Sequence, residues 1–148
     1  MHSVFITYAP DSADTRRTVD HVRAAFDPAA FSVSVKPAAE TAMPDLAGAD
    51  LVVFGLQKAQ GGDAPVDYAE LLRSLKGVNL GGRAAAIFSL GADKASAKLR
   101  KALRDTDITL VEDEPSLPTD HKPSSPAEIE AWTRKLSSSL LELRRARG

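Results

Sequence analysis

The chain contains no cysteine and no large excess of either charge. Without cysteine there can be no disulfide bond, thiolate nucleophile, iron–sulfur cluster or thiolate zinc site. The net charge is −1 over 148 residues, so no overall field draws the chain to nucleic acid, an anionic membrane or a strongly basic partner. The apolar content of 43% and the charged content of 26% are typical of a soluble globular protein.

Long apolar runs are also absent. No stretch approaches the roughly 18 apolar residues that a membrane-spanning helix needs. The first residues, Met1 to Phe5, lack the basic and apolar regions of a signal peptide. There is no internal repeat and no shift in composition that marks a domain boundary. We therefore expect a cytoplasmic protein whose residues 1–148 form a single domain.

Five short segments rich in apolar and β-branched residues alternate with helical patterns. The predicted strands are residues 4–8, 31–35, 51–55, 84–90 and 108–111, and the predicted helices are 16–26, 68–77, 94–106 and 126–147, with a single turn at 44–46. Strands that alternate with helices over short connections form a parallel sheet covered on both faces. The sequence therefore predicts an α/β fold: a three-layer α-β-α sandwich with a doubly wound five-stranded parallel sheet in the order 2-1-3-4-5.

A ligand site in such a sheet lies at the carboxyl ends of the strands, where the winding direction reverses. In the predicted order, that point lies between the first and third strands. Three loops meet there, and they are predicted at Ala9–Thr15, Leu56–Pro65 and Gly91–Lys94. Any bound ligand is therefore expected between these loops.

Three stretches of the chain resemble the flavodoxin family. "LKGVNLGGRAAAIFSLGAD" is similar to the family's turn, fourth strand and following loop, and "PAEIEAWTRKL" is similar to its last helix. "YAPDSADT" aligns with its phosphate turn, which has the pattern Thr/Ser-x-Thr-Gly-x-Thr. The resemblance covers nearly the whole chain, and the length suits a short-chain flavodoxin. It implies the flavodoxin-like fold, with FMN as the family's cofactor and low-potential electron transfer as its activity.

The phosphate turn of this chain departs from the family pattern. Its residues are Pro10, Asp11, Ser12, Ala13, Asp14 and Thr15. Pro10 has no N–H to donate, and Ala13 replaces the glycine, which is unfavourable if the turn requires a positive φ. Asp11 and Asp14 each place a negative charge beside the phosphate, with a repulsion of about 1 to 4 kcal/mol at contact distance. Ser12 and Thr15 retain hydroxyls, and we interpret the two aspartates as caps of the following helix.

The two loops that would flank the flavin ring contain no aromatic residue. The second loop would contribute Leu56, Gln57, Lys58, Ala59, Gln60 and Gly61, and the third would contribute Leu90, Gly91, Ala92 and Asp93. In the family, aromatic residues of these loops stack on the ring, and stacking is a main source of ring affinity. Tyr68 and Trp132 lie on the apolar faces of predicted helices, and we interpret both as core residues.

These departures favour a flavodoxin-like domain that has lost or weakened flavin binding and acts as a non-catalytic protein-interaction module. We expect no cofactor, no catalytic residue and an unidentified protein as partner, with neither nucleic acid nor a membrane as partner. The alternative is an FMN-binding electron carrier. In that case Ser12 and Thr15 hold the phosphate, and the segments Gln57–Gly61 and Leu90–Asp93 flank the ring.

Two signalling folds provide weaker matches, and a Toll/interleukin-receptor-type signalling domain is the third option for the function. "VFITYAPDSADTRR" resembles the opening of a Toll/interleukin-receptor-type domain, and "DYAELLRSL" places Glu70 where that family has a helical glutamate. A receiver-type phosphoacceptor needs an aspartate at the end of the third strand, whereas Asp50 lies at its start. Asp11 and Asp14 lack a third carboxylate in the neighbouring loop for holding magnesium, so no metal is expected.

Histidines and basic residues elsewhere follow no catalytic pattern. His2, His21 and His121 are scattered without metal-ligand spacing. The predicted helix after the fourth strand is basic, with Lys94, Lys98, Arg100, Lys101 and Arg104. Such a run is either a solvated face or a patch that docks an acidic partner.

Overall fold

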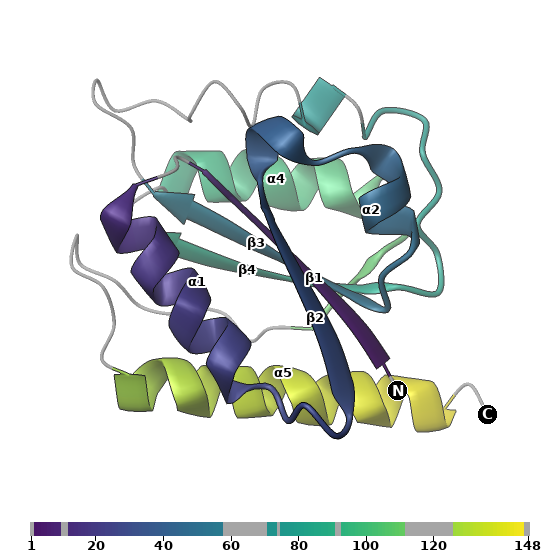
Figure 1. Cartoon of the computed structure of the whole chain (residues 1–148). Helices are drawn as coiled ribbons and strands as arrows, with labels where there is room; N and C mark the ends of the chain where they lie inside the picture. Colours follow the sequence, from purple (N-terminus) through teal and green to yellow (C-terminus); the bar gives the residue numbers. More distant parts are fainter. Residues whose placement is uncertain are drawn as a thin grey trace.

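The computed structural model of the chain describes residues 2–9, 12–57, 71–73, 75–90, 93–111 and 126–146, and for residues 14, 90, 93–95, 126 and 144–146 it describes the backbone alone. At its centre is a five-stranded sheet in the order β2-β1-β3-β4-β5 (Figure 1). The strands are β1 (His2–Ala9), β2 (Phe31–Pro37), β3 (Leu51–Gln57), β4 (Ala84–Leu90) and β5 (Thr109–Leu110). Every strand pairing is parallel. The predicted strand order is therefore confirmed.

Helices cover both faces of this sheet (Figure 1). One face is covered by α1 (Ala13–Ala25) and α5 (Pro126–Ala146). The other face is covered by α2 (Met43–Ala47), the helical residues 71–73 and α4 (Asp93–Arg104). A short 3₁₀ turn, η1 (Ala38–Glu40), precedes α2. The three-layer sandwich is confirmed, including the single helical turn predicted near Pro44.

The side chains of β3 alternate between two hydrophobic cores. Val52, Phe54 and Leu56 belong to the core under α2 and α4, whereas Leu51 and Val53 belong to the core under α1 and α5. All residues from Leu51 to Leu56 are buried, which explains why the apolar run in the sequence shows no alternation. The same period of two places Gln57, the last residue of β3, on the face that α1 covers.

Gly55 lies directly under an aromatic ring of the neighbouring strand. It pairs in register with Phe88 of β4, and a Cβ atom added to it would lie 2.3 Å from Cζ of Phe88. The ring of Phe88 meets that of Trp132 in α5 edge to face, with 6.1 Å between ring centroids. Trp132 packs against the core under α1 and α5, as predicted. The glycine thus provides the space in which β4 and α5 pack together.

The strands differ from the sequence prediction mainly at their ends. β3 continues through Gln57, two residues beyond the predicted end at Gly55, because Leu56 is fully buried and pairs with Ala9 and Ser89. β5 is shorter than predicted, with Thr109 and Leu110 alone. Tyr68 and the capping residue Ser125 lie outside the described residues.

Within the described part of the chain, no helix combines the length and the apolar character needed to cross a bilayer.

Candidate functional site

Ser12 forms the N-cap of α1 at the carboxyl edge of the sheet. Its backbone is extended, with φ −111° and ψ 162°, and its Oγ accepts a hydrogen bond of 3.2 Å from the backbone N–H of Thr15. Serine at this position satisfies one of the N–H groups that the first turn of a helix leaves without a partner. The cap is therefore Ser12 and not the aspartates that we had expected, since Asp14 is the second residue of α1.

Two hydroxyls and one amide carbonyl form a cluster at this point. The Thr15 hydroxyl donates a hydrogen bond of 2.8 Å to Oε1 of Gln57, and the Ser12 hydroxyl donates to the same oxygen. The Ser12 and Thr15 hydroxyl oxygens lie 2.9 Å apart. Thr15 is fully buried, so its hydroxyl depends on these partners. The side chain of Gln57 thus joins the end of β3 to the first turn of α1.

The cluster has the donor chemistry of an anion site. Two hydroxyl protons converge on one acceptor oxygen beside the N-terminus of a helix of 13 residues, where the backbone dipole favours negative charge. A phosphate oxygen accepts the same hydrogen bonds that Oε1 of Gln57 accepts. Binding of a phosphate group here therefore requires the Gln57 side chain to turn away.

Ala13, which replaces the glycine of the family's phosphate turn, has a helical backbone. Ala13 is the first residue of α1, and among the described residues the one non-glycine with a positive φ is Asp107, at 65°. The penalty expected for alanine if the turn required a positive φ therefore does not apply, because the backbone at this position is helical. The predicted repulsion between the two aspartates and a phosphate stays a prediction, because Asp11 and the side chain of Asp14 lie outside the described residues.

Some of the remaining predicted site residues lie in the described part of the chain, and the others lie outside it. Leu56 is fully buried in the core under α2 and α4, so its side chain faces away from Ser12 and Thr15. Leu90 ends β4 and Asp93 begins α4, both described by their backbone alone. The residues outside the described part of the chain are Pro10, Asp11, Lys58, Ala59, Gln60, Gly61, Gly91 and Ala92. Of the predicted phosphate turn, the structure therefore describes Ser12, Ala13 and Thr15 with their side chains, and Asp14 by its backbone.

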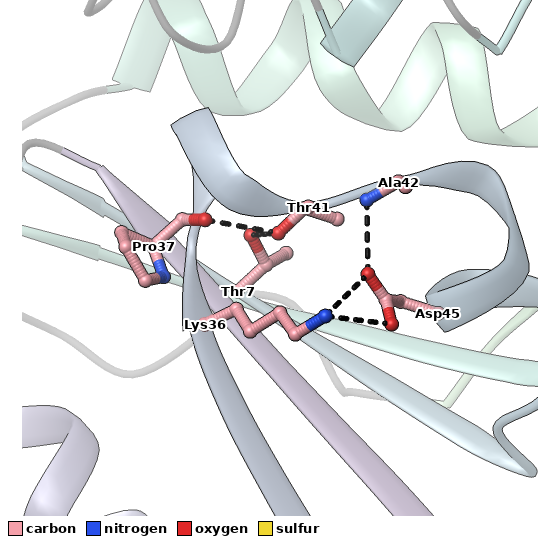
Figure 2. A network of polar contacts seen from close by, with 6 residues as sticks. All are labelled: Thr7, Lys36, Pro37, Thr41, Ala42 and Asp45. Atoms are coloured by element: carbon pink, nitrogen blue, oxygen red, sulfur yellow. Dashed lines mark hydrogen bonds and ion pairs between the residues drawn. The ribbon is translucent and has the colours of Figure 1, made fainter.

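A second polar network at the same end of β1 was not anticipated from the sequence. Thr7 is fully buried, and its hydroxyl oxygen lies 2.8 Å from that of Thr41, which donates a hydrogen bond of 3.1 Å to the carbonyl oxygen of Pro37 (Figure 2). This network ties the segment between β2 and β3 to β1. It lies on the face that α2 covers and not on the face of α1.

The start of α2 is held by a carboxylate. Asp45 accepts a hydrogen bond of 3.0 Å from the backbone N–H of Ala42 and forms an ion pair of 3.1 Å with Lys36 of β2 (Figure 2). The hydrogen bond from Ala42, together with Lys36, holds the pKa of Asp45 below its usual value, against the opposing effect of burial. Asp45 and Lys36 therefore stabilise the crossover and do not form part of the phosphate cluster.

The structure places Asp50 at the opposite end of β3 from this cluster. Its carboxylate accepts a hydrogen bond of 2.9 Å from the backbone N–H of Ser3, at the start of β1. The last residue of β3 is Gln57, where a receiver-type phosphoacceptor needs an aspartate. Among the described residues, no three acidic or histidine side chains lie close enough to hold a metal ion.

Comparisons with known proteins agree on the fold. No family model matches the chain, and no curated protein matches it in sequence. Among solved structures, a short-chain flavodoxin associated with a PDU bacterial microcompartment matches with a TM-score of 0.81 and 13% identity, over 95% of this chain and 99% of that one. A flavodoxin of Streptococcus pneumonia matches with a TM-score of 0.78 and 14% identity, over 92% and 98%.

A flavodoxin of Fusobacterium nucleatum, solved with flavin mononucleotide bound, matches with a TM-score of 0.72 and 13% identity, over 93% of this chain and 98% of that one. These identities are too low to carry residue roles from one chain to the other. The aligned residues nevertheless make up more than nine-tenths of this chain and of each of the three matched chains. The chain therefore has the flavodoxin-like fold in its short-chain form.

Proposed function

We propose that this protein binds FMN and serves as an electron carrier, with its phosphate held at the N-terminus of α1. The observation that carries this proposal is the convergence of the Ser12 and Thr15 hydroxyls between the ends of β1 and β3. Flavodoxins share the fold over nearly the whole chain, and one of them was solved with FMN bound. This proposal departs from our expectation of a non-catalytic interaction module with lost or weakened flavin binding, and it takes up the alternative.

The described donor groups fit a phosphate monoester. Ser12 and Thr15 would donate their hydroxyl protons to phosphate oxygens, and the dipole of α1 would favour the charge. The buried Leu56 anchors the end of β3, so that Gln57 can move without displacing the strand. FMN, when bound, would supply the electron-accepting and electron-donating chemistry.

A non-catalytic interaction module remains the second candidate, because Gln57 satisfies both hydroxyls without any ligand. In this case the Gln57 contact is a permanent structural link between β3 and α1. The two candidates differ in what Gln57 does when FMN is added. It turns away in an electron carrier and stays in place in an interaction module.

Titration of the purified protein with FMN and with riboflavin separates the two candidates. For an electron carrier, we expect quenching of flavin fluorescence at micromolar FMN and much weaker binding of riboflavin, which has no phosphate. Thr15→Val is expected to weaken FMN binding about tenfold, since it removes a hydrogen bond to a charged group. Thr18→Val is the matched control, because Thr18 is also a fully buried threonine of α1. Absence of quenching by FMN would leave the interaction module as the function.

A further inference from the structure

A groove of about 280 Å³ lies on the face of the molecule opposite to α1 and α5. Its apolar floor is formed by Leu72 and Leu75 from one side and by Ala102 of α4 from the other. Leu75 is buried in the core, whereas Leu72 and Ala102 are partly exposed and pack against it. The floor therefore presents aliphatic surface to the solvent between two charged walls.

The rim of the groove is basic. Arg73 and Lys76 line one side, and Lys98 and Lys101 line the other, all four with exposed side chains. Among the lining residues that the structure describes, Asp105 is the single acidic one. Because the whole chain has a net charge of −1, this concentration of positive charge is a local feature and not a property of the surface as a whole.

The groove is distinct from the candidate phosphate site. Ser12, Thr15 and Gln57 lie at the carboxyl ends of β1 and β3. Lys98 lies in the middle of α4, Lys101 lies in its last turn, and Asp105 follows the helix in the turn that leads to the start of β5 (Figure 1). In a parallel sheet, the start of a strand lies at the end of the sheet opposite to the carboxyl ends of the strands. A partner seated in the groove thus leaves the phosphate site accessible.

We propose that this groove docks an acidic segment of a partner protein, one that presents an aliphatic side chain flanked by carboxylates. The lysine and arginine stems extend the apolar surface of the floor, and their charged ends meet the carboxylates of the partner. Among the described lining residues, the side chains that face the groove are aliphatic or charged.

The proposal is tested with the full chain labelled with ¹⁵N and a synthetic helical peptide of about 15 residues, in which glutamates flank two leucines one turn apart. Addition of the peptide is expected to shift the backbone resonances of Leu72–Lys76 and Lys98–Asp105. Lys98→Glu should weaken binding about fivefold, because an exposed charge at an interface rim contributes on the order of 1 kcal/mol. Added salt should weaken it further. Lys135→Glu is the matched control, since Lys135 is an exposed lysine of α5 on the other side of the sheet.

Three outcomes would overturn the proposal. The first is the absence of shifts in both segments at about 1 mM peptide, a concentration at which a site with a dissociation constant of about 1 mM is half occupied. The second is equal weakening by Lys98→Glu and Lys135→Glu, which would indicate a nonspecific response to charge. The third is tighter binding of single-stranded oligouridylate or of phosphatidylserine vesicles to the same two segments. Replacement of the peptide leucines by serine should abolish the shifts if the apolar floor takes part.

Discussion

Thr15 donates a hydrogen bond of 2.8 Å to the side-chain carbonyl of Gln57, a residue 42 positions away in the sequence. Ser12 donates to the same oxygen. One amide group thus occupies both hydroxyls that a phosphate would need, and it connects β3 to the helix that covers it. In this account Gln57 competes with the phosphate of FMN.

The first prediction concerns removal of this competitor. Gln57→Ala should strengthen FMN binding about tenfold, because two hydrogen bonds of net 0.5–1.5 kcal/mol each no longer have to be broken. Riboflavin binding, measured by the same fluorescence titration, should change little. The variant should also unfold more easily in urea by about 1 to 2 kcal/mol, since the buried Thr15 hydroxyl loses its acceptor. Unchanged affinity for FMN would argue against competition.

The second prediction concerns the contact between Gly55 and Phe88. Gly55→Ala should lower the free energy of unfolding by about 1 to 3 kcal/mol, because the new methyl group would overlap the ring of Phe88. Gly55→Ala combined with Phe88→Leu should recover part of this loss relative to the sum of the single changes. Urea denaturation of the two single variants and the double variant measures the coupling. Simple additivity would show that the ring does not fill this space.

The third prediction concerns pH and Asp45. The folded protein holds the pKa of this carboxyl below its usual value, so the ionised form favours folding. The stabilisation is complete above the unfolded-state pKa and is lost as the pH falls through the lower, folded-state pKa. Asp45→Asn should therefore reduce stability near neutral pH by about 0.5 to 1 kcal/mol, because Asp45 lies in the first turn of α2 and pairs with the exposed Lys36. The difference from wild type should vanish in acid. Asp20→Asn, on the exposed face of α1, is the control.

The fourth prediction concerns the backbone at Gly77. Its φ is 75°, and a Cβ atom added there would meet nothing within 4 Å. Gly77→Ala should therefore cost about 1 to 2 kcal/mol of unfolding free energy through backbone strain alone. Gly77→Asn should cost less, because asparagine tolerates this conformation better than alanine. Equal costs in thermal or urea unfolding would point to a cause other than φ.

The sheet could be predicted because its strands have strong local patterns. The apolar run from Leu51 to Phe54 predicts a buried strand without knowledge of tertiary contacts. In the same way, Gly77 predicts the end of a helix. The end of β3 could not be placed in this way, because Leu56 extends the strand only through its pairing with Ala9 and Ser89. Tertiary neighbours therefore decide where a strand ends.

The candidate site could be predicted in its location but not in its contacts. The strand order places Ser12, Thr15 and Gln57 at one edge of the sheet, as expected. The sequence also contains a signal for the orientation of Gln57, since a period of two along β3 places it on the same face as Val53. The hydrogen bonds themselves depend on how α1 packs against β3, which no local pattern encodes.

The most direct test of competition follows the side-chain amide resonance of Gln57 during a titration with FMN. We expect this resonance to shift in proportion to bound FMN and to stay in place when riboflavin is added instead. A Gln57 amide that does not respond at saturating FMN would contradict competition, because both hydroxyls would still be engaged by the protein itself.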